Sequence, residues 1–299
     1  MPIQDLRVNL TPSEKDKDMK GRKEVLSKIL QGRWSSLYKG EGIEFAGFRR
    51  YTSADDAELI DWKASLRTDK LVVREFEELK NYTVIFLLDV SDSMLFTSQD
   101  KLKVEYAAEL TYDLADAVQK TGDSVGLIMF NDDIAARVDS RVGAGVMNGF
   151  ETVLSDGENY GGGFNLRKPV TLARDMVGDR AVMVIVSDFF GIEGDWEKYI
   201  YMMSQEFEML GININDPRDI NFPDSGGQFL LEHPYKDENI YVDVQEYKEK
   251  YDEIAMEEHD YVQNVFRNAK GELLQIRTDK DYMTELIRFF QRKKKGRGV

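Results

Sequence analysis

Short apolar runs alternate along the chain with segments in which apolar residues recur at helical spacing. The runs at 82–90 (YTVIFLLDV), 122–130 (GDSVGLIMF) and 180–189 (RAVMVIVSDF) are rich in β-branched residues, as is typical of strands covered on both faces. A weaker run at 272–278 predicts one more strand. Helical spacing predicts helices over 104–118, 166–177, 196–210 and 283–290, and a long acidic amphipathic helix over 244–266.

This alternation predicts an α/β fold: a Rossmann-type, doubly wound and mainly parallel sheet flanked by helices. We expect residues 81–299 to form this domain, with short strands and turns over 213–244. Residues 1–80 are expected to form a small N-terminal helix and β segment packed on it, with a helix near 15–30 and a strand in KLVVREF (70–76). Ligands of such sheets bind beyond the carboxyl ends of the strands.

Composition narrows the possible functions. The chain has 299 residues, no Cys and only two His, so thiol chemistry, zinc-thiolate sites and a His-based triad are not expected. The net charge of -15 disfavours general binding to nucleic acid. Because there is neither a long apolar run nor a hydrophobic signal region, we expect a cytoplasmic protein without membrane insertion.

Polar side chains follow two of the predicted strands. Asp89, Ser91 and Ser93 end the first strand and Asp188 ends the third, so all four are expected at the same edge. Asp89, Ser91 and Ser93 alternate along an extended turn and can converge on one point, whereas Asp92 would face away. Carboxylate and hydroxyl oxygens form a hard ligand set of the kind that Mg²⁺ prefers. The alternative is a capped turn in which Asp and Ser bond only their own backbone.

Two further features carry a family resemblance. The segment DVSDSM resembles the DxSxS element of von Willebrand factor A-type domains, whose adhesion site binds Mg²⁺. Upstream, GIEFAGFRRYTSADDAELIDWKASLRTDKLVVREFEE resembles the signature of the domain of unknown function 58 family, commonly linked to MoxR-type AAA+ ATPases. The matching positions are Gly42, Glu44, Phe45, Arg49, Tyr51, Asp55, Asp56, Ile60, Asp61, Trp62, Arg67, Glu77 and Glu78. The likeness spans roughly residues 36 to 292.

The resemblance implies a von Willebrand factor A-like domain with Mg²⁺, or Mn²⁺, held by Asp89, Ser91, Ser93 and Asp188. A coordination position would remain for a carboxylate of a partner, either a MoxR-type ATPase or a client protein. At the metal site the sequence departs from the pattern: Phe164 stands where such domains supply a threonine from a GGT loop, and a phenyl ring does not ligate Mg²⁺. Asn165 could substitute through its carbonyl oxygen. In the signature, Ala54 replaces the expected Gly and Glu58 a second basic residue.

The signature residues Arg49, Asp61, Trp62 and Arg67 are candidates for a partner-binding surface, since exposed Trp and Arg often anchor interfaces. The alternative, which we favour for Trp62, is a buried structural role. Arg49, Arg50 and Arg67 with Asp55, Asp56 and Asp61 would then form an internal ion-pair network.

The resulting expectation is a non-enzymatic adaptor that acts with a MoxR-type ATPase in the assembly or maturation of protein complexes. A metal-free scaffold with a degenerate site is the alternative, because of Phe164. A Mg-dependent phosphatase is less favoured: Ser91 stands where haloacid dehalogenase-type enzymes carry their acid.

Overall fold

The computed structural model describes residues 6–10, 17–37, 43–52, 55–56, 59–68, 70–78, 82–177, 181–190, 192, 194–222, 227–232 and 239–295. The chain forms two compact units. The larger comprises Met1–Leu30 and Tyr82–Val299, and the smaller Gln31–Asn81. The predicted boundary near residue 80 is thereby corrected for the first thirty residues, which belong to the larger unit because Leu26 and Leu30 are fully buried in its core.

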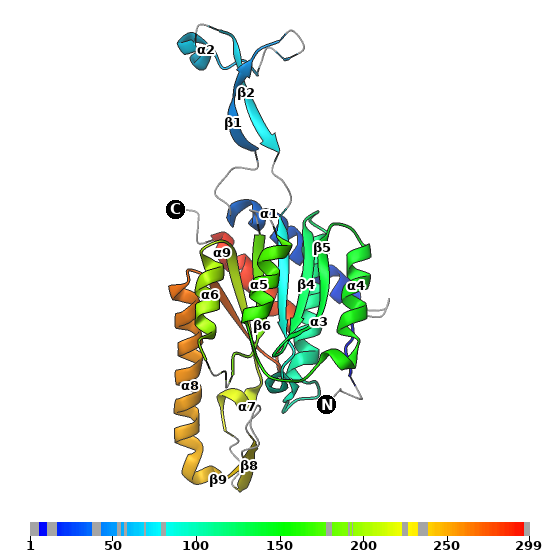
Figure 1. The fold of residues 1–299 in the computed structure, drawn as a ribbon, viewed down its shortest axis with the longest axis vertical. Helices are drawn as coiled ribbons and strands as arrows, with labels where there is room; N and C mark the ends of the chain where they lie inside the picture. Colours follow the sequence, from blue (N-terminus) through cyan, green and yellow to red (C-terminus); the bar gives the residue numbers. More distant parts are fainter. Residues whose placement is uncertain are drawn as a thin grey trace. The chain divides into compact units, whose positions relative to one another are not determined.

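The larger unit is built on a six-stranded sheet with the order β10-β7-β6-β3-β4-β5 (Figure 1). All neighbouring pairs are parallel except β4 and β5. This is the doubly wound order 3-2-1-4-5-6 with one antiparallel edge strand, so the predicted fold class is confirmed. The strands are β3 (Thr83–Asp89), β4 (Ser124–Phe130), β5 (Ile134–Arg141), β6 (Ala181–Ser187), β7 (Glu208–Asn215) and β10 (Glu272–Arg277).

Helices cover both faces of the sheet (Figure 1). One face carries α3 (Lys103–Gln119), α4 (Gly145–Leu154), α9 (Tyr282–Lys295) and, up to Leu30, α1 (Lys17–Leu37). The other carries α5 (Arg167–Met176), α6 (Trp196–Ser204) and α8 (Val244–Asn268), whose apolar side chains form one cluster with β3, β4 and β6. Two short 3₁₀ helices, η2 (Asp92–Leu95) and η3 (Gly157–Asn159), lie in the connections.

The prediction of a helix over 196–210 was wrong in its second half. Helix α6 ends at Ser204, and the chain then enters β7, a buried central strand. Gly211 lies in the middle of β7 and interrupts the apolar run that would have signalled a strand. A Cβ at Gly211 would lie 2.5 Å from the Phe266 ring, so the close packing of α8 requires glycine there.

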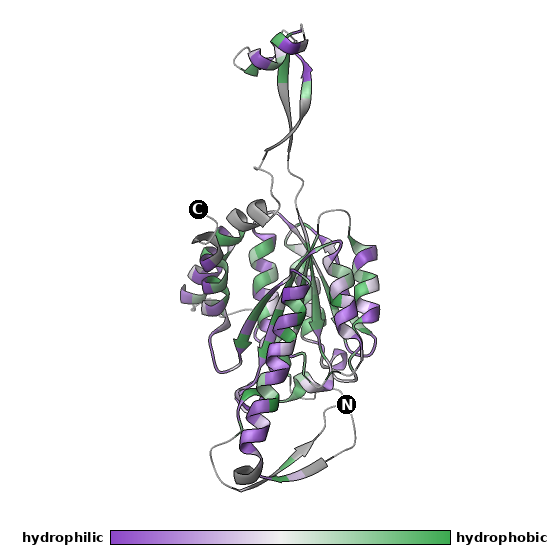
Figure 2. Ribbon diagram, turned by 90° about the vertical axis from the view of Figure 1, so that its left-hand side faces the viewer, coloured by the Kyte–Doolittle hydropathy of each residue, from purple (hydrophilic) through white to green (hydrophobic). Residues whose placement is uncertain are grey.

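Beyond the carboxyl ends of the strands lie α7 (Pro217–Ile220) and the hairpin of β8 (Gln228–Glu232) and β9 (Asn239–Asp243). Helix α8 starts directly after this hairpin and confirms the long helix predicted from the sequence. Figure 2 shows much of α8 in purple, because its outer face is strongly polar, whereas the strands of the sheet are green. In the described part of the chain, no helix combines the length and the apolar character needed to cross a membrane.

The smaller unit contains an antiparallel pair, β1 (Ile43–Arg50) and β2 (Val72–Glu78), and helix α2 (Trp62–Thr68). Burial of Val72 and Val73 and of Ser65 ties the strands to α2, where the Ser65 hydroxyl accepts the Val72 N–H at 3.0 Å. Of the family signature, Gly42 lies outside the described residues, as do the side chains of Glu44, Phe45, Glu77 and Glu78.

Candidate metal centre at the sheet edge

The sheet order reverses between β3 and β6, which lie side by side at the centre of the sheet. Asp89 is the last residue of β3, and Asp188 directly follows β6. Ser91 directly precedes η2, and Ser93 is the second residue of η2. All four are buried, and they meet at the switch point of the fold, where doubly wound sheets place their ligands.

Three side-chain oxygens of this edge form a continuous row. The Ser91 and Ser93 hydroxyl oxygens are 3.3 Å apart, and the Ser93 hydroxyl donates to Asp188 Oδ1 at 3.1 Å. In an octahedron with metal–oxygen bonds of about 2.0–2.1 Å, neighbouring ligand oxygens are roughly 2.9 Å apart. The observed spacings are close to this value, so the three oxygens fit adjacent corners of a Mg²⁺ coordination shell.

Asp89 lies beside this row and is held by two hydrogen bonds. Its Oδ1 accepts the Ser91 N–H at 2.9 Å, and its Oδ2 accepts the Ser187 hydroxyl at 2.6 Å. Burial, together with the neighbouring charge of Asp188, raises the pKa of Asp89 to about 7, against an ordinary value of 3.8. A bound cation at this edge would therefore stabilise the ionised carboxylate of Asp89.

One cation is already part of the edge. Lys103, the first residue of α3, has a side chain that is 1% exposed. Its Nζ pairs with Asp188 Oδ2 at 2.7 Å and with Asp219 Oδ2 at 2.9 Å, and these carboxylates raise its pKa despite burial. The rings of Phe96 and Phe190 lie 5.6 and 5.8 Å from the ammonium, so it is enclosed between carboxylates and aromatic faces.

Sequence reasoning missed Lys103, although a signal exists. Lys103 lies one turn before Ala107 on the stripe that α3 buries, a position where a surface lysine is not expected. Its partner Asp219 is the third residue of α7 and also accepts the Asp216 N–H at 2.8 Å. The site therefore combines groups that follow β3, β6 and β7.

The backbone after Asp188 is held in an uncommon conformation. Phe189 has φ +51°, which is rare for a non-glycine residue. Its buried ring packs on Trp196 and Phe266, with centroids 5.3 and 5.5 Å away. This packing stabilises a turn that lets Asp188 Oδ1 also accept the Phe190 N–H at 3.1 Å.

The neighbouring glycine loop is bonded to the turn through its backbone. Asp92 exchanges two hydrogen bonds with Gly162, one from its amide at 2.8 Å and one to its carboxylate at 2.9 Å. Asp92 thus contacts the loop and not the row of oxygens, as predicted. Phe164 packs its ring on Phe130 with a centroid distance of 5.5 Å, and the exposed Asn165 uses Oδ1 to accept the Arg167 N–H at 3.0 Å.

The charge of the edge remains unbalanced. Lys103 faces two carboxylates, and Asp89 adds a third within the same hydrogen-bonded group. Among the described residues, no group of three or more His, Asp or Glu side chains is placed to hold a metal ion. A cation here would thus take serine hydroxyls as ligands, which suits Mg²⁺ or Mn²⁺ better than softer metals.

The predicted partner-binding residues lie in the smaller unit. Trp62 is 64% exposed, so the preferred interpretation of a buried Trp62 was wrong. Arg49 forms a bidentate ion pair with Asp55, with Arg49 Nη1 and Nη2 at 2.7 and 2.6 Å from the two carboxylate oxygens. Asp61 begins α2 by accepting the Ala64 N–H at 3.0 Å, and Arg67 is exposed in its last turn. Exposed Leu59 and Leu66 accompany Trp62.

The fold and this edge define a class: a doubly wound α/β protein with an oxygen-rich, partly neutralised site at the switch point of its sheet. The family model described as "Protein of unknown function DUF58" matches residues 47–261. Because this is more than half of the chain, the protein belongs to that family, as the signature predicted.

Relatives and solved structures extend the comparison. Uncharacterized protein Rv1480 of Mycobacterium tuberculosis and uncharacterized protein Mb1516 of Mycobacterium bovis are each 24% identical over 280 residues, covering 92% of this chain and 87% of theirs. The conserved hypothetical protein BatB of Bacteroides thetaiotaomicron is 16% identical with a TM-score of 0.48, covering 72% of this chain and 100% of that one. A von Willebrand factor type A structure from Catenulispora acidiphila is 14% identical with a TM-score of 0.33, covering 48% and 35%.

Proposed function

We propose that this protein is a non-enzymatic binding module whose sheet edge, when loaded with Mg²⁺, binds a carboxylate of a protein partner. The observation that supports this proposal most is the row formed by Ser91, Ser93 and Asp188. Its neighbouring oxygens lie 3.3 and 3.1 Å apart, within a cluster of three carboxylates and one lysine. When bound, Mg²⁺ supplies a coordination position that a partner's carboxylate can fill.

The residues of the edge have separate roles in this proposal. The Ser91 and Ser93 hydroxyls and Asp188 Oδ1 are the direct ligands, while Asp89 orients Ser91 through its N–H. Lys103 holds the other oxygen of Asp188 and so fixes the direction of that carboxylate. Asn165 is a weaker candidate ligand, because its carbonyl oxygen caps Arg167. Mn²⁺ has the same ligand preferences and should replace Mg²⁺.

The partner we propose is a MoxR-type AAA+ ATPase or a client protein presented to one, in the assembly or maturation of protein complexes. The smaller unit supports an adaptor role, because Trp62, Leu59 and Leu66 expose large apolar side chains. Such side chains are enriched at protein interfaces. A protein with a metal-dependent edge and an exposed tryptophan could contact two partners at once.

The test is co-purification of a MoxR-type ATPase from the same organism with the tagged protein, in Mg²⁺ and in excess chelator. We expect retention in Mg²⁺, loss in chelator, and loss with Ser93→Ala. The exposed Ser155, which follows α4, provides the matched control Ser155→Ala, which should retain the ATPase. Retention that is equal in chelator and with Ser93→Ala would contradict a metal-dependent edge.

A second candidate function is a metal-free scaffold, and Lys103 is the observation that favours it. Its ammonium already neutralises Asp188 and Asp219, and Phe164 contributes to the core where a threonine ligand is expected. In that case the ATPase would be retained regardless of Mg²⁺, and Trp62→Ala would abolish the interaction.

A further inference from the structure

Phe96 is an exposed aromatic residue beside the metal centre. It directly follows η2 and is 46% exposed. Its N–H donates to the Ser93 carbonyl oxygen at 3.4 Å, and its own carbonyl oxygen accepts the Lys103 N–H at 3.2 Å. The backbone of Phe96 is therefore bonded both to a proposed metal ligand and to the lysine that pairs with Asp188.

A second phenyl ring flanks the same lysine. The ring centroids of Phe96 and Phe190 lie 5.6 and 5.8 Å from Lys103 Nζ. The N–H of the half-buried Phe190 donates to Asp188 Oδ1 at 3.1 Å, so this residue is also attached to the row of oxygens. Phe96 and Phe190 together form an aromatic rim beside the row.

Exposure alone does not assign a role to Phe96, since single apolar side chains are common on protein surfaces. What distinguishes Phe96 is its position at the proposed binding edge. Lys103 is almost completely covered, with 1% of its side chain exposed, yet nearly half of Phe96 remains in contact with water. Aromatic side chains are enriched at protein interfaces, where they bury a large apolar area.

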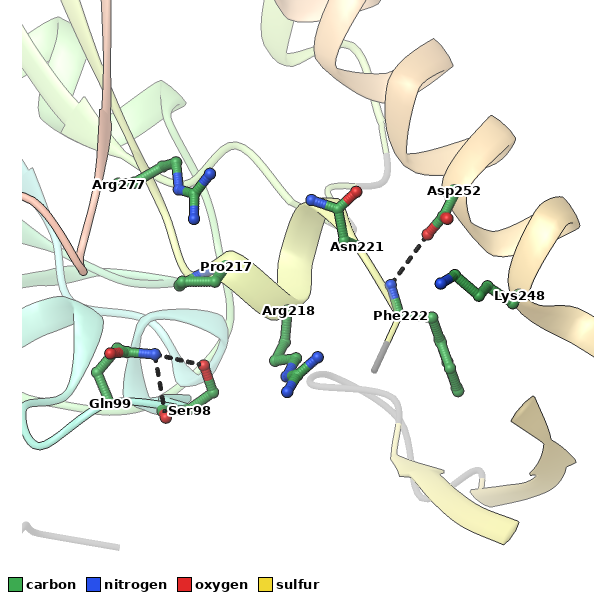
Figure 3. Close-up of a pocket in the computed structure, with 9 residues that line it drawn as sticks. All are labelled: Ser98, Gln99, Pro217, Arg218, Asn221, Phe222, Lys248, Asp252 and Arg277. Carbon is green, nitrogen blue, oxygen red and sulfur yellow. Dashed lines mark hydrogen bonds between the residues drawn. The ribbon is translucent and has the colours of Figure 1, made fainter. Parts of the chain in front are cut away.

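The loop that carries Phe96 is held in place before a partner arrives. The Gln99 N–H donates to Thr97 Oγ1 at 2.8 Å, and the Ser98 N–H donates to Asp216 Oδ2 at 2.8 Å. Figure 3 shows Ser98 and Gln99 beside α7, where a pocket of about 400 Å³ opens. A preorganised loop reduces the entropic cost of binding, and the pocket leaves room beside it for the chain of a partner.

We infer that the aromatic rim selects a partner whose metal-binding carboxylate is flanked by apolar side chains. This inference rests on the proposed function, because the bound Mg²⁺ brings the carboxylate to the rim. Apolar neighbours of the carboxylate pack on the exposed part of Phe96, whereas polar neighbours lose water there without gaining a hydrogen bond. This packing also excludes water from the carboxylate and so strengthens its attraction to the metal.

The experiment compares two fluorescein-labelled peptides, Gly-Leu-Glu-Leu-Gly and Gly-Ser-Glu-Ser-Gly, each amidated at the carboxyl end so that glutamate is its only carboxylic residue. Anisotropy is followed as the full chain is added, in Mg²⁺ and in excess chelator. The readout is the ratio of the two dissociation constants. The variants are Phe96→Ala and Phe96→Gln, the second of which keeps a long side chain over Lys103. The control is Val142→Ala, a residue that is 57% exposed and follows β5 at the opposite end of the sheet.

We expect the wild type in Mg²⁺ to bind the leucine peptide about tenfold more tightly than the serine peptide, because a leucine side chain is buried on the rim. In both Phe96 variants this ratio should fall below about twofold, and in Val142→Ala it should stay near about tenfold. A role of Phe96 in merely covering Lys103 would weaken both peptides equally and leave the ratio unchanged.

Equal binding of the two peptides by the wild type, or an unchanged ratio in the Phe96 variants, overturns the inference and leaves the proposed function standing. A preference for leucine that persists in chelator supports the rim and contradicts the metal-dependent edge. Absence of binding of both peptides in Mg²⁺ contradicts the proposed function and the inference with it. Thermal melting establishes that each variant is folded.

Discussion

Two buried lysine–aspartate pairs of the larger unit differ in what surrounds them. Lys23 of α1 pairs with Asp113 of α3 at 2.5 Å, and the Tyr282 hydroxyl donates to the same carboxylate at 3.0 Å. That cluster contains one cation, one anion and one neutral donor. Lys103 at the sheet edge instead faces Asp188 and Asp219, with Asp89 beyond them.

The difference indicates a structural role for the Lys23 cluster and a functional role for the Lys103 cluster. The Lys23 cluster is balanced and links α1, α3 and α9, so it is a means of holding helices together. The Lys103 cluster contains three carboxylates for one cation, and burial together with the charge of Asp188 raises the pKa of Asp89, since buried charge is unfavourable unless it is compensated. Burial of a charged pair is therefore not the sign of a site, whereas imbalance within a buried cluster is.

The largest changes in the free energy of unfolding should come from replacing the two lysines, Lys103 and Lys23. Lys103→Met leaves two buried carboxylates without their cation, and we expect the free energy of unfolding to fall by about 3–5 kcal/mol. Lys23→Met leaves one carboxylate that keeps its tyrosine hydrogen bond, and should cost about half as much. Urea unfolding without metal measures both. Equal losses would remove the distinction between the clusters.

Neutralising one carboxylate should change the free energy of unfolding in opposite directions in the two clusters. Asp89→Asn relieves the excess charge and should stabilise the metal-free protein at pH 8 by about 1–3 kcal/mol. Asp113→Asn leaves Lys23 without its counter-ion and should destabilise it by about 1–2 kcal/mol. Asp92→Asn, which keeps the bond from Gly162, is the matched control and should be neutral. Thermal and urea unfolding at fixed pH give the comparison.

The stability of the metal-free protein should also depend on pH through Asp89. Its pKa in the folded protein is about 7, against 3.8 as the ordinary value, so between these values the folded state holds a proton that the unfolded chain has released. This contribution is fully present below about pH 4 and is lost as the pH rises through 7, by at most about 4 kcal/mol. Urea midpoints across this window should show a steeper decline for wild type than for Asp89→Asn. Parallel declines would show that Asp89 does not titrate there.

The smallest change in the free energy of unfolding should come from replacing a side chain outside both clusters. Trp62 is 64% exposed, so Trp62→Ala should change the free energy of unfolding by no more than about 0.5 kcal/mol. The same variant should weaken binding of the partner if the surface of α2 is an interface. Urea unfolding and co-purification measure the two quantities separately, and a large loss of stability would restore the buried role first favoured for Trp62.

Much of the sheet could be predicted, for physical reasons that are visible in particular residues. Strands β3 and β6 are covered on both faces and read as unbroken apolar runs, and β4 remains recognisable although Gly126 interrupts it. Strand β7 was not recognised, because Gly211, which the approach of Phe266 requires, and the buried Asn213 and Asn215 all interrupt its apolar residues. Edge strand β5 and helix α4 were not predicted either; β5 alternates between partly exposed and exposed residues without a clear apolar face.

Four of the six residues described at the candidate site were predicted from the sequence. Asp89, Ser91, Ser93 and Asp188 were placed together because the carboxyl ends of parallel strands meet at one edge. Lys103 and Asp219 were missed, because their pairing depends on how α3 and α7 approach the sheet.

The most direct test of the excess charge at the sheet edge is a calorimetric titration of chelator-stripped protein with MgCl₂ and MnCl₂ at pH 8, beside Asp89→Ala. We predict saturable binding to the wild type, with a rise in melting temperature as the metal concentration passes Kd, and loss of both in Asp89→Ala. No binding at millimolar metal, or binding that persists in Asp89→Ala, would contradict the account and leave the neutralisation of Asp188 to Lys103.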